Sequence, residues 1–292
     1  MKNDLFEMIS FLITFSSFSN RSFSISESSP TWAVSCMRGI KDKVAIVTGG
    51  AKGIGWGICQ RLAVEGAKII VADIDIQGAA EAAEKLIQSG VAAEGYGVDL
   101  RKVEEIDRMM DYVYEKYGSI DILINNAGVQ IREWATDFEE EKFDLLMDLN
   151  LKAYYFAARA AARYMKQQGG GSIVCISSAN STCYTSRRSP YNISKAAVNG
   201  LVGTLAVEWG RFNIRINAVA PGYVLTDMVK KGVEEGIIDM DTNFKVIPMK
   251  RFITLEEIGN GVCFLASDEA GGVTGQTLFI DGGWSCCGLP ED

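Results

Sequence analysis

Seven short apolar runs recur along the chain from Val44 onward, and most are apolar at successive positions rather than at alternate ones. Strands that are covered on both faces show this continuous pattern. The pattern therefore predicts a buried sheet. Its strands are expected at Val44–Thr48, Lys68–Asp73, Ala93–Asp99, Asp121–Ile124, Ser172–Ser177, Ile214–Val219 and Gln276–Ile280.

Longer segments with helical periodicity separate these runs, the clearest being Gly53–Glu65, Gln77–Gln88 and Phe143–Gln168. Repeated β-α units specify a parallel sheet with right-handed crossovers. There is neither a sequence repeat nor an internal linker rich in Pro, Gly and Ser. We therefore predict a single α/β domain over residues 37–292.

Residues 1–36 differ in composition from the rest because Ser, Phe and Thr are abundant there. The apolar stretch Met8–Phe15 is too short to span a bilayer, and Asp4 and Glu7 are unusual at the start of a signal peptide. We expect an extension outside the fold: a disordered tail, or sequence translated upstream of a start at Met37. A Ser-rich transit peptide is the alternative.

The composition argues against several partners. A net charge of −8 disfavours nucleic acid, which needs a basic face. The seven cysteines are an odd number without a Cys-x-x-Cys pair, so we expect no disulfide framework, no metal site and a reducing, cytoplasmic setting. The chain has no histidine, so another residue must transfer any catalytic proton.

A glycine-rich turn, Thr48–Gly55, follows the first predicted strand and opens the first predicted helix. Glycines there let the backbone turn sharply and approach a pyrophosphate at the helix N-terminus. The pattern indicates nucleotide binding by Gly49, Lys52, Gly53, Ile54 and Gly55.

Asp73 ends the second strand about 20 residues beyond this turn, where a carboxylate can accept hydrogen bonds from adenosine ribose hydroxyls. The same charge would repel a 2′-phosphate, whereas Lys52 could attract it. Like-charge repulsion at a buried position should outweigh an exposed contact, so we expect NAD in preference to NADP.

Tyr191 and Lys195 are four residues apart, so on a helix they share one face. A cation beside a phenol favours the phenolate and lowers its pKa. The spacing alone is weak evidence, because Tyr112 and Lys116 repeat it within an amphipathic segment. Only the surroundings of Tyr191 distinguish the two pairs.

Those surroundings are typical of a known family. Thr48–Gly55, Asn125–Gly128, Ser178, the Tyr191/Lys195 pair and Pro221–Gly222 occur in the order and spacing of the short-chain dehydrogenase/reductase family, which the chain resembles over about residues 40–285. The resemblance implies a doubly wound Rossmann-type domain with a seven-stranded parallel sheet, usually assembled as a homotetramer.

The resemblance also implies functional residues. It assigns Asp99 and Leu100 to the adenine pocket, and Asn125, Asn126, Ala127 and Gly128 to the cofactor wall. Pro221, Gly222, Val224 and Thr226 fall at the nicotinamide end. Tyr191 would be the general acid/base and Ser178 would bond the substrate oxygen. Lys195 would lower the pKa of Tyr191 and bond the nicotinamide ribose, and Asn150 would hold a water for proton relay. The neighbouring hydroxyls, Ser177 and Ser181, are expected to be structural.

The reaction implied is hydride transfer between a nicotinamide cofactor and a secondary alcohol or ketone. We expect Gln130, Arg132, Asn180 and Arg188 to contact the small-molecule substrate, because the loops after the fourth and fifth strands surround it in this family. Arginines there suit a carboxylate or phosphate. Several motifs are similar to those of sugar, polyol and sugar-acid members, including gluconate 5-dehydrogenase-like enzymes. Residues 223–250 are expected to form an acidic lid.

Two alternatives remain. A 3-oxoacyl-carrier-protein reductase shares the fold and the catalytic set, but it normally uses NADPH and needs a basic surface for its partner. A non-catalytic, cofactor-sensing regulatory protein often lacks the tyrosine or the lysine, and this chain has both.

Overall fold

The computed structural model describes residues 37–235 and 240–287, with the side chains of residues 228 and 241–243 excepted. Residues 36–292 form one compact unit. The predicted extension, residues 1–36, lies outside the described residues.

A seven-stranded parallel sheet forms the centre of this unit, in the order β3-β2-β1-β4-β5-β6-β7. This is the predicted doubly wound arrangement, and each of the seven expected strands is present within about two residues of its expected bounds. The strands are β1 Val44–Thr48, β2 Lys68–Asp73, β3 Ala93–Gly97, β4 Ile122–Asn125, β5 Gly171–Ile176, β6 Ile214–Pro221 and β7 Thr277–Ile280.

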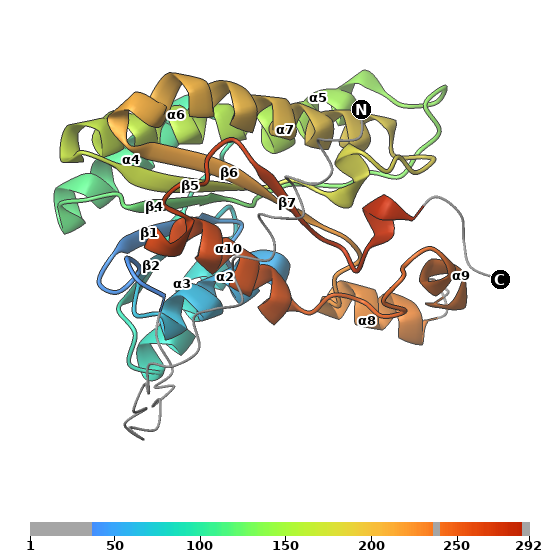
Figure 1. The fold of residues 1–292 in the computed structure, drawn as a ribbon, viewed down its shortest axis with the longest axis horizontal. Helices are drawn as coiled ribbons and strands as arrows, with labels where there is room; N and C mark the ends of the chain where they lie inside the picture. The colour runs from blue at the N-terminus through green and yellow to red at the C-terminus, as the bar shows by residue number, and fades with distance from the viewer. Residues whose placement is uncertain (1–36, 236–239, 288–292) are drawn as a thin grey trace, which may run out of the picture. The chain divides into compact units, whose positions relative to one another are not determined.

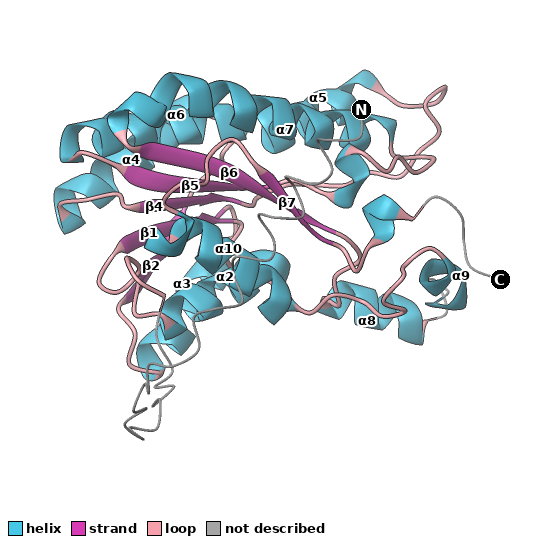
Figure 2. Cartoon of the chain, viewed as in Figure 1, coloured by secondary structure: helices cyan, strands magenta, loops and turns pink. Residues whose placement is uncertain are grey.

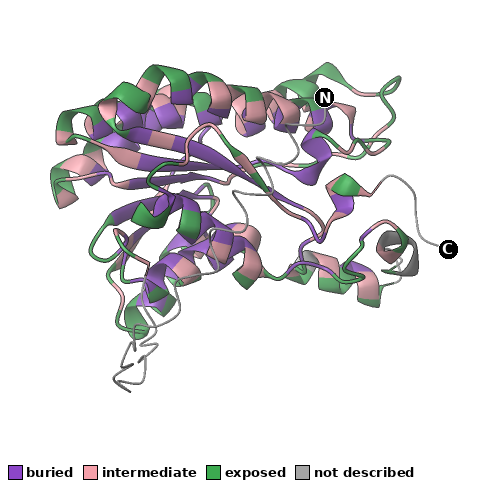
Figure 3. Ribbon diagram, viewed as in Figure 1, coloured by how far each residue is buried: buried purple, intermediate pink, exposed green. Residues whose placement is uncertain are grey.

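Helices cover both faces of the sheet (Figures 1 and 2). One face packs against α4 Val103–Tyr117, α6 Ala153–Gln168 and α7 Ser189–Trp209. The other packs against α2 Gly53–Val64, α3 Ile76–Gln88 and α10 Leu255–Ala266. The central strands are buried and the outer helix faces exposed, as the continuous apolar runs predicted (Figure 3).

The long helix expected at Phe143–Gln168 is interrupted. Helix α5 Glu140–Met147 is followed by a π-helical segment, Asp148–Lys152, before α6 begins. The segment is only five residues long, too short for apolar periodicity to distinguish a π-helical turn from an α-helical one.

Two short helices follow β6, α8 Asp227–Glu234 and α9 Met240–Lys245. They lie over a small apolar cluster that is separate from the two main cores and includes Phe252 and Trp284. Tyr223 packs on Trp284 with ring centroids 4.9 Å apart. In the described part of the chain, no helix combines the length and apolar character needed to cross a bilayer.

Candidate active site

The chemically distinctive residues gather at the carboxyl edge of the sheet. The glycine-rich turn follows β1, Asn126 follows β4, and Ser178 follows β5. Strand order reverses direction between β1 and β4, and open parallel sheets bind ligands beside such a switch point. The fold therefore brings the predicted cofactor and catalytic residues to one edge.

The glycine-rich turn requires glycine at several positions, either for its backbone angles or for lack of space. Gly49 and Gly53 have φ of 63° and 58°, values that favour glycine. A Cβ on Gly55 would lie 2.0 Å from the Gly49 carbonyl oxygen. Asn126 fixes the turn by donating its side-chain amide to the carbonyls of Thr48 and Gly49, at 2.9 and 3.1 Å. A bare backbone at the start of α2 fits a pyrophosphate.

Asp73 lies at the end of β2 and is 8% exposed. One of its oxygens accepts the Ala51 N–H at 3.2 Å and the other accepts the Asp75 N–H at 3.1 Å. The carboxylate is thereby held against the glycine-rich turn, as a ribose-binding group would be. Lys52 is exposed and caps α2 without a side-chain hydrogen bond.

Asp99 and Leu100, the two residues expected in the adenine pocket, have different surroundings in the structure. The Asp99 carboxylate is paired with Arg101 at 2.7 Å, and this hydrogen bond is the largest cause of its lowered pKa. Leu100 is buried in the main core beside α4 and α6. Their contact with adenine stays a prediction.

Asn125, expected on the cofactor wall, turns away from it. Its side chain is 1% exposed and donates to the Tyr154 carbonyl at 3.1 Å. Because successive strand residues face opposite sides, Asn126 is the one beside the glycine-rich turn. Ala127 is half-buried and its N–H donates to the Thr48 hydroxyl at 3.2 Å, and Gly128 is exposed.

At the expected nicotinamide end, Pro221 closes β6, and a Cβ on Gly222 would lie 2.7 Å from the Asp281 Cα. Val224 is buried and pairs with Ile253. Thr226 caps α8 by accepting the Val229 N–H at 3.3 Å, which leaves its hydroxyl hydrogen for a ligand.

Tyr191 is half-buried in the first turn of α7. Burial raises the pKa of its phenol, whereas the Ser178 hydrogen bond and the Arg188 charge lower it. On balance the pKa of Tyr191 is raised, and the Arg188 charge opposes that rise. The Lys195 ammonium lies 5.8 Å from the centroid of the Tyr191 ring, and its expected lowering of the pKa stays a prediction. The three-residue spacing from Arg188 to Tyr191 is a signal that the sequence analysis did not use.

Lys195 is buried with no carboxylate partner among the described residues. Its ammonium donates to the Ile176 carbonyl at 2.7 Å and to the Tyr154 hydroxyl at 3.4 Å. Burial lowers its pKa to about 8. An ammonium has three donors, so one remains for a ligand, which fits the expected bond to the nicotinamide ribose. Tyr154 was not identified from sequence, because no motif marks it.

Asn150 lies in the π-helical segment and is completely buried. Its side chain exchanges hydrogen bonds with the Val129 backbone, at 2.8 and 2.9 Å, and donates to the Ser194 hydroxyl at 3.2 Å. The side chain therefore anchors the loop after β4. Its expected role in holding a relay water stays a prediction.

The neighbouring serines have the structural roles expected of them. The Ser177 hydroxyl donates to the Asn199 side chain at 2.7 Å, and the Ser181 hydroxyl accepts from the same side chain at 3.0 Å. Ser178 instead caps a short turn by accepting the Asn180 N–H at 3.1 Å.

The expected substrate residues divide into two kinds. Gln130 and Arg132 are exposed on the loop after β4, and Arg188 is buried before α7. The buried Asn180 amide donates to Cys183, Thr185 and Asn192, while its oxygen accepts from Arg188 at 3.4 Å. Asn180 is thus a support for this loop, which the sequence could not distinguish from a ligand contact.

Tyr112 and Lys116, the decoy pair that repeats the spacing of Tyr191 and Lys195, lie elsewhere, on α4. Lys116 donates to the Tyr112 hydroxyl at 2.9 Å, and both side chains bond the Glu94 carboxylate. Glu94 satisfies this pair, and no glycine-rich turn lies beside it. It therefore has a structural explanation.

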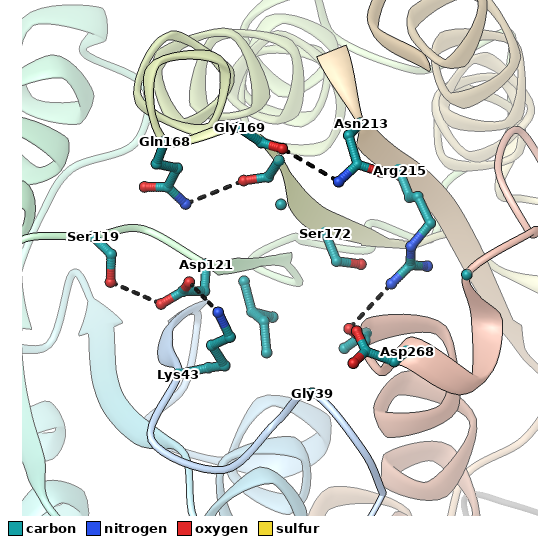
Figure 4. Close-up of a pocket in the computed structure, with 15 residues that line it drawn as sticks. Gly39, Lys43, Ser119, Asp121, Gln168, Gly169, Ser172, Asn213, Arg215 and Asp268 are labelled. Carbon is teal, nitrogen blue, oxygen red and sulfur yellow. Dashed lines mark hydrogen bonds and ion pairs between the residues drawn. The ribbon is translucent and has the colours of Figure 1, made fainter. Parts of the chain in front are cut away.

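A cavity of about 500 Å³ lies at the opposite, amino-terminal edge of the sheet (Figure 4). Three of its charged groups have partners: Lys43 pairs with Asp121 at 3.0 Å, and Arg215 donates to the Leu265 carbonyl at 2.6 Å. It is not the catalytic site, because the strands carry Ser178 and the glycine-rich turn at their other ends.

Comparison with known proteins identifies the family. The family model described as "Enoyl-(Acyl carrier protein) reductase" matches residues 49–285. An NAD-dependent glycerol dehydrogenase of Listeria innocua is 38% identical, over 84% of this chain and 95% of its own. The chain belongs to the short-chain dehydrogenase/reductase family. It is therefore an oxidoreductase that acts on CH–OH groups with a nicotinamide cofactor.

Other members with similar identity carry different names. A 3-oxoacyl-[acyl-carrier-protein] reductase of Thermotoga maritima is 36% identical, covering 84% of this chain and 98% of its own. The structure of a gluconate 5-dehydrogenase from Burkholderia cenocepacia, in complex with NADP and tartrate, matches with a TM-score of 0.80 and 33% identity. That match covers 84% of this chain and 96% of the other. Identity alone does not select a substrate for this short-chain dehydrogenase.

Proposed function

We propose that the enzyme uses NAD to interconvert a secondary alcohol and a ketone on a polyol, sugar or sugar acid. The observation that carries this is the joint position of Ser178, Tyr191 and Lys195 beside the glycine-rich turn. The names of the glycerol and gluconate relatives support a small hydroxylated substrate.

In the oxidation direction, Tyr191 accepts the hydroxyl proton while the carbinol C–H bond breaks. The nicotinamide supplies the acceptor for the hydride, so a ketone, the reduced cofactor and a proton are formed. Ser178 hydrogen-bonds the substrate oxygen and, through its bond to Tyr191, stabilises the phenolate. Lys195 would donate its third N–H to the nicotinamide ribose when the cofactor is bound. Asn150 holds the loop that carries Gln130 and Arg132 in position.

The preference for NAD rests on Asp73. A buried carboxylate held against the glycine-rich turn suits two ribose hydroxyls and repels a phosphate. Lys52 is exposed, so it offers a phosphate a weaker, screened attraction. The structure of the Burkholderia gluconate 5-dehydrogenase contains NADP, which describes the cofactor of that enzyme and not of this one.

A 3-oxoacyl-carrier-protein reductase is the second candidate, favoured by the Thermotoga relative and by the description of the family model. Asp73 and the net charge of −8 argue against NADPH and an acidic partner protein. The third alternative, a non-catalytic sensor, is disfavoured because such proteins often lack the tyrosine or the lysine, and this chain has both Tyr191 and Lys195.

We also propose a homotetramer in the cytoplasm. Exposed apolar side chains on α6 and α7, among them Tyr155, Ile193 and Val207, support self-association. Among the described residues, Cys59, Cys175, Cys183, Cys263 and Cys286 are free thiols, as a reducing compartment would keep them. Light scattering that gives the mass of one chain would refute the tetramer, and cell fractionation tests the location.

Residues 223–250 are proposed as the lid. Of these, residues 236–239 lie outside the described residues. Tyr223 and Phe244 belong to the same apolar cluster as Ala179 and Cys183, on the loop that follows Ser178. Slower hydrogen exchange in α8 on addition of NAD and substrate would support closure, and unchanged exchange would argue against it.

A substrate panel tests the function. The enzyme, with NAD or NADP, is offered alditols, aldonates, hydroxy acids and the corresponding ketones, and NAD(P)H is followed by absorbance. We expect turnover of small polyhydroxylated compounds with NAD. Activity confined to 3-oxoacyl thioesters with NADPH would establish the alternative, and an enzyme that binds NAD without any turnover would indicate a sensor.

A further inference from the structure

A buried arginine without an acidic partner lies beside the catalytic tyrosine. Arg188 is 8% exposed, yet the only hydrogen bond that its side chain donates to the described residues is a long one, 3.4 Å, to the neutral Asn180 oxygen. No carboxylate among the described residues lies within ion-pair distance of it. Buried guanidinium groups are normally paired, because removing their charge from water is costly. Arg188 therefore points to a missing anion.

The neighbouring loop adds positive charge instead of balancing it. Arg132 is exposed, and its pKa is lowered first by the partial desolvation of its guanidinium and then by the charges of Arg188 and Arg187. The nearest acidic residue in sequence, Glu133, is occupied by Lys142 at 3.0 Å. Three cations thus accumulate in a protein whose net charge is −8.

The two loops that carry these arginines are joined. The Glu133 N–H donates to the Arg187 carbonyl at 2.9 Å, and the Arg187 guanidinium lies over the Trp134 ring, 5.6 Å from its centroid. Arg187 is thereby directed to the ring, while Arg132 and Arg188 keep their N–H groups available to a ligand. Their mutual repulsion falls when an anion binds between them.

The position of this charge relates it to the reaction. Arg188 is the N-cap of α7, and Tyr191 lies three residues later in the first turn. Side chains three residues apart are neighbours on a helix, so a group bound by Arg188 lies close to the carbon that reacts. A guanidinium presents a planar fork that matches a carboxylate. A small substrate can reach both groups at once if its carboxylate and its reacting hydroxyl are a few bonds apart.

We propose that Arg188, assisted by Arg132, binds a carboxylate of the substrate, so that the enzyme acts on hydroxy acids such as aldonates in preference to neutral polyols. This inference rests on the proposed function and selects the acid from the classes named there. Arg188 is then a substrate-binding residue that distinguishes this enzyme from a glycerol-type dehydrogenase. The fork also orients the substrate, because it fixes one end while Ser178 and Tyr191 hold the other.

Matched pairs of acid and neutral substrates test the proposal. The NAD-loaded enzyme is compared on D-gluconate against D-glucitol, and on 3-hydroxybutyrate against its amide. We expect the acid of a pair to have the higher kcat/KM, by about 30-fold or more, the effect of a buried charge contact. Arg188→Gln should remove that advantage, and Arg132→Gln should reduce it. Arg188→Lys should restore part of it, because the charge returns without the fork.

Arg211→Gln is the matched control. Arg211 is exposed after the far end of α7 and lies over the Phe212 ring, so the variant removes the same charge at a remote place. Its preference for acids should equal that of the wild type. The melting temperature of each variant reports whether it folds. Arg132→Gln, on an exposed loop, keeps the test available if Arg188→Gln does not fold.

A binding measurement gives a readout without turnover. Malonate, a dicarboxylate that cannot be oxidised here, should bind the NADH-loaded wild type and Arg211→Gln, and bind Arg188→Gln at least about 30-fold more weakly. Malonamide, the neutral analogue, should bind neither the wild type nor the variants. Any of three results would overturn the proposal. Arg188→Gln could lose activity equally on the acid and the neutral substrate, or the wild type could prefer the neutral substrate of a pair. The wild type could also have a higher kcat/KM for a polyol phosphate than for the aldonate. The proposed function would fail differently, through absence of turnover on both members of every pair.

Discussion

At the scale of single residues, burial decides which charge matters. Lys195 is the cation that the motif supplies, but its ammonium is held by the Ile176 carbonyl and its pKa falls to about 8. Burial raises the pKa of Tyr191, and the charge of Arg188, which no motif supplies, opposes that rise. Four-residue spacing on a helix brings side chains to one face without fixing where their charged ends lie.

Asp73 gives the sharpest prediction at this scale. Asp73→Asn keeps one acceptor oxygen for the Ala51 or Asp75 N–H but removes the charge that would repel a 2′-phosphate. We expect the ratio of kcat/KM with NAD to that with NADP to fall by about 10- to 100-fold, the range for one like-charge contact.

Asp75→Asn is the control for that experiment. Asp75 caps α3 by accepting the Gly78 N–H at 3.0 Å, and asparagine caps helices equally well. Its cofactor ratio should stay at the wild-type value. An unchanged ratio in Asp73→Asn would mean that Asp73 does not select the cofactor.

The asparagines show where prediction from residues ends. Asn126, Asn150 and Asn180 were all expected near the ligands, and all three lie at the predicted edge of the sheet. Their side chains are nevertheless used to hold backbone, as the Asn126 bond to the Gly49 carbonyl illustrates. An amide serves a loop or a ligand equally well, so only the positions of its neighbours decide.

At the scale of elements, the apolar pattern predicted the strands well, because each strand is covered on both faces. It did not predict the π-helical segment, since a widened turn depends on the hydrogen bonds of Asn150 to another loop. Nor did it predict α8 and α9 within the expected lid, where the amphipathic pattern is short.

The glycine-rich turn allows a test of an element. Gly55→Ala would place a Cβ 2.0 Å from the Gly49 carbonyl oxygen and 2.6 Å from the Asn126 side chain, so the turn must deform. We expect NAD binding, measured by calorimetry, to fall below detection. Gly200→Ala is the matched variant, because Gly200 lies exposed within α7 with no atom within 4 Å of a Cβ. Gly200→Ala should bind NAD normally, and its free energy of unfolding should be about 1 kcal/mol higher than that of the wild type. Normal NAD affinity in Gly55→Ala would contradict the assigned site.

At the scale of the whole molecule, the strand order explains why residues from distant segments meet. The sheet runs outward from β1 in both directions, so the turn after β1 and the ends of β4 and β5 lie at one switch point. The order of motifs along the sequence could reveal this through the family resemblance. The sequence did not reveal that several arginines gather around Arg188. They come from two loops, and only the structure shows that these loops lie together.

The central claim is that Tyr191 transfers the proton in a dehydrogenase without histidine. The most direct test compares kcat for Tyr191→Phe and Tyr112→Phe, using the best substrate from the panel with saturating NAD. We expect a loss of about 10²- to 10⁴-fold in Tyr191→Phe, the usual contribution of a general acid/base, with NAD affinity unchanged. Tyr112→Phe removes the same hydroxyl from the decoy pair and should keep wild-type kcat. A wild-type rate in Tyr191→Phe would contradict the mechanism.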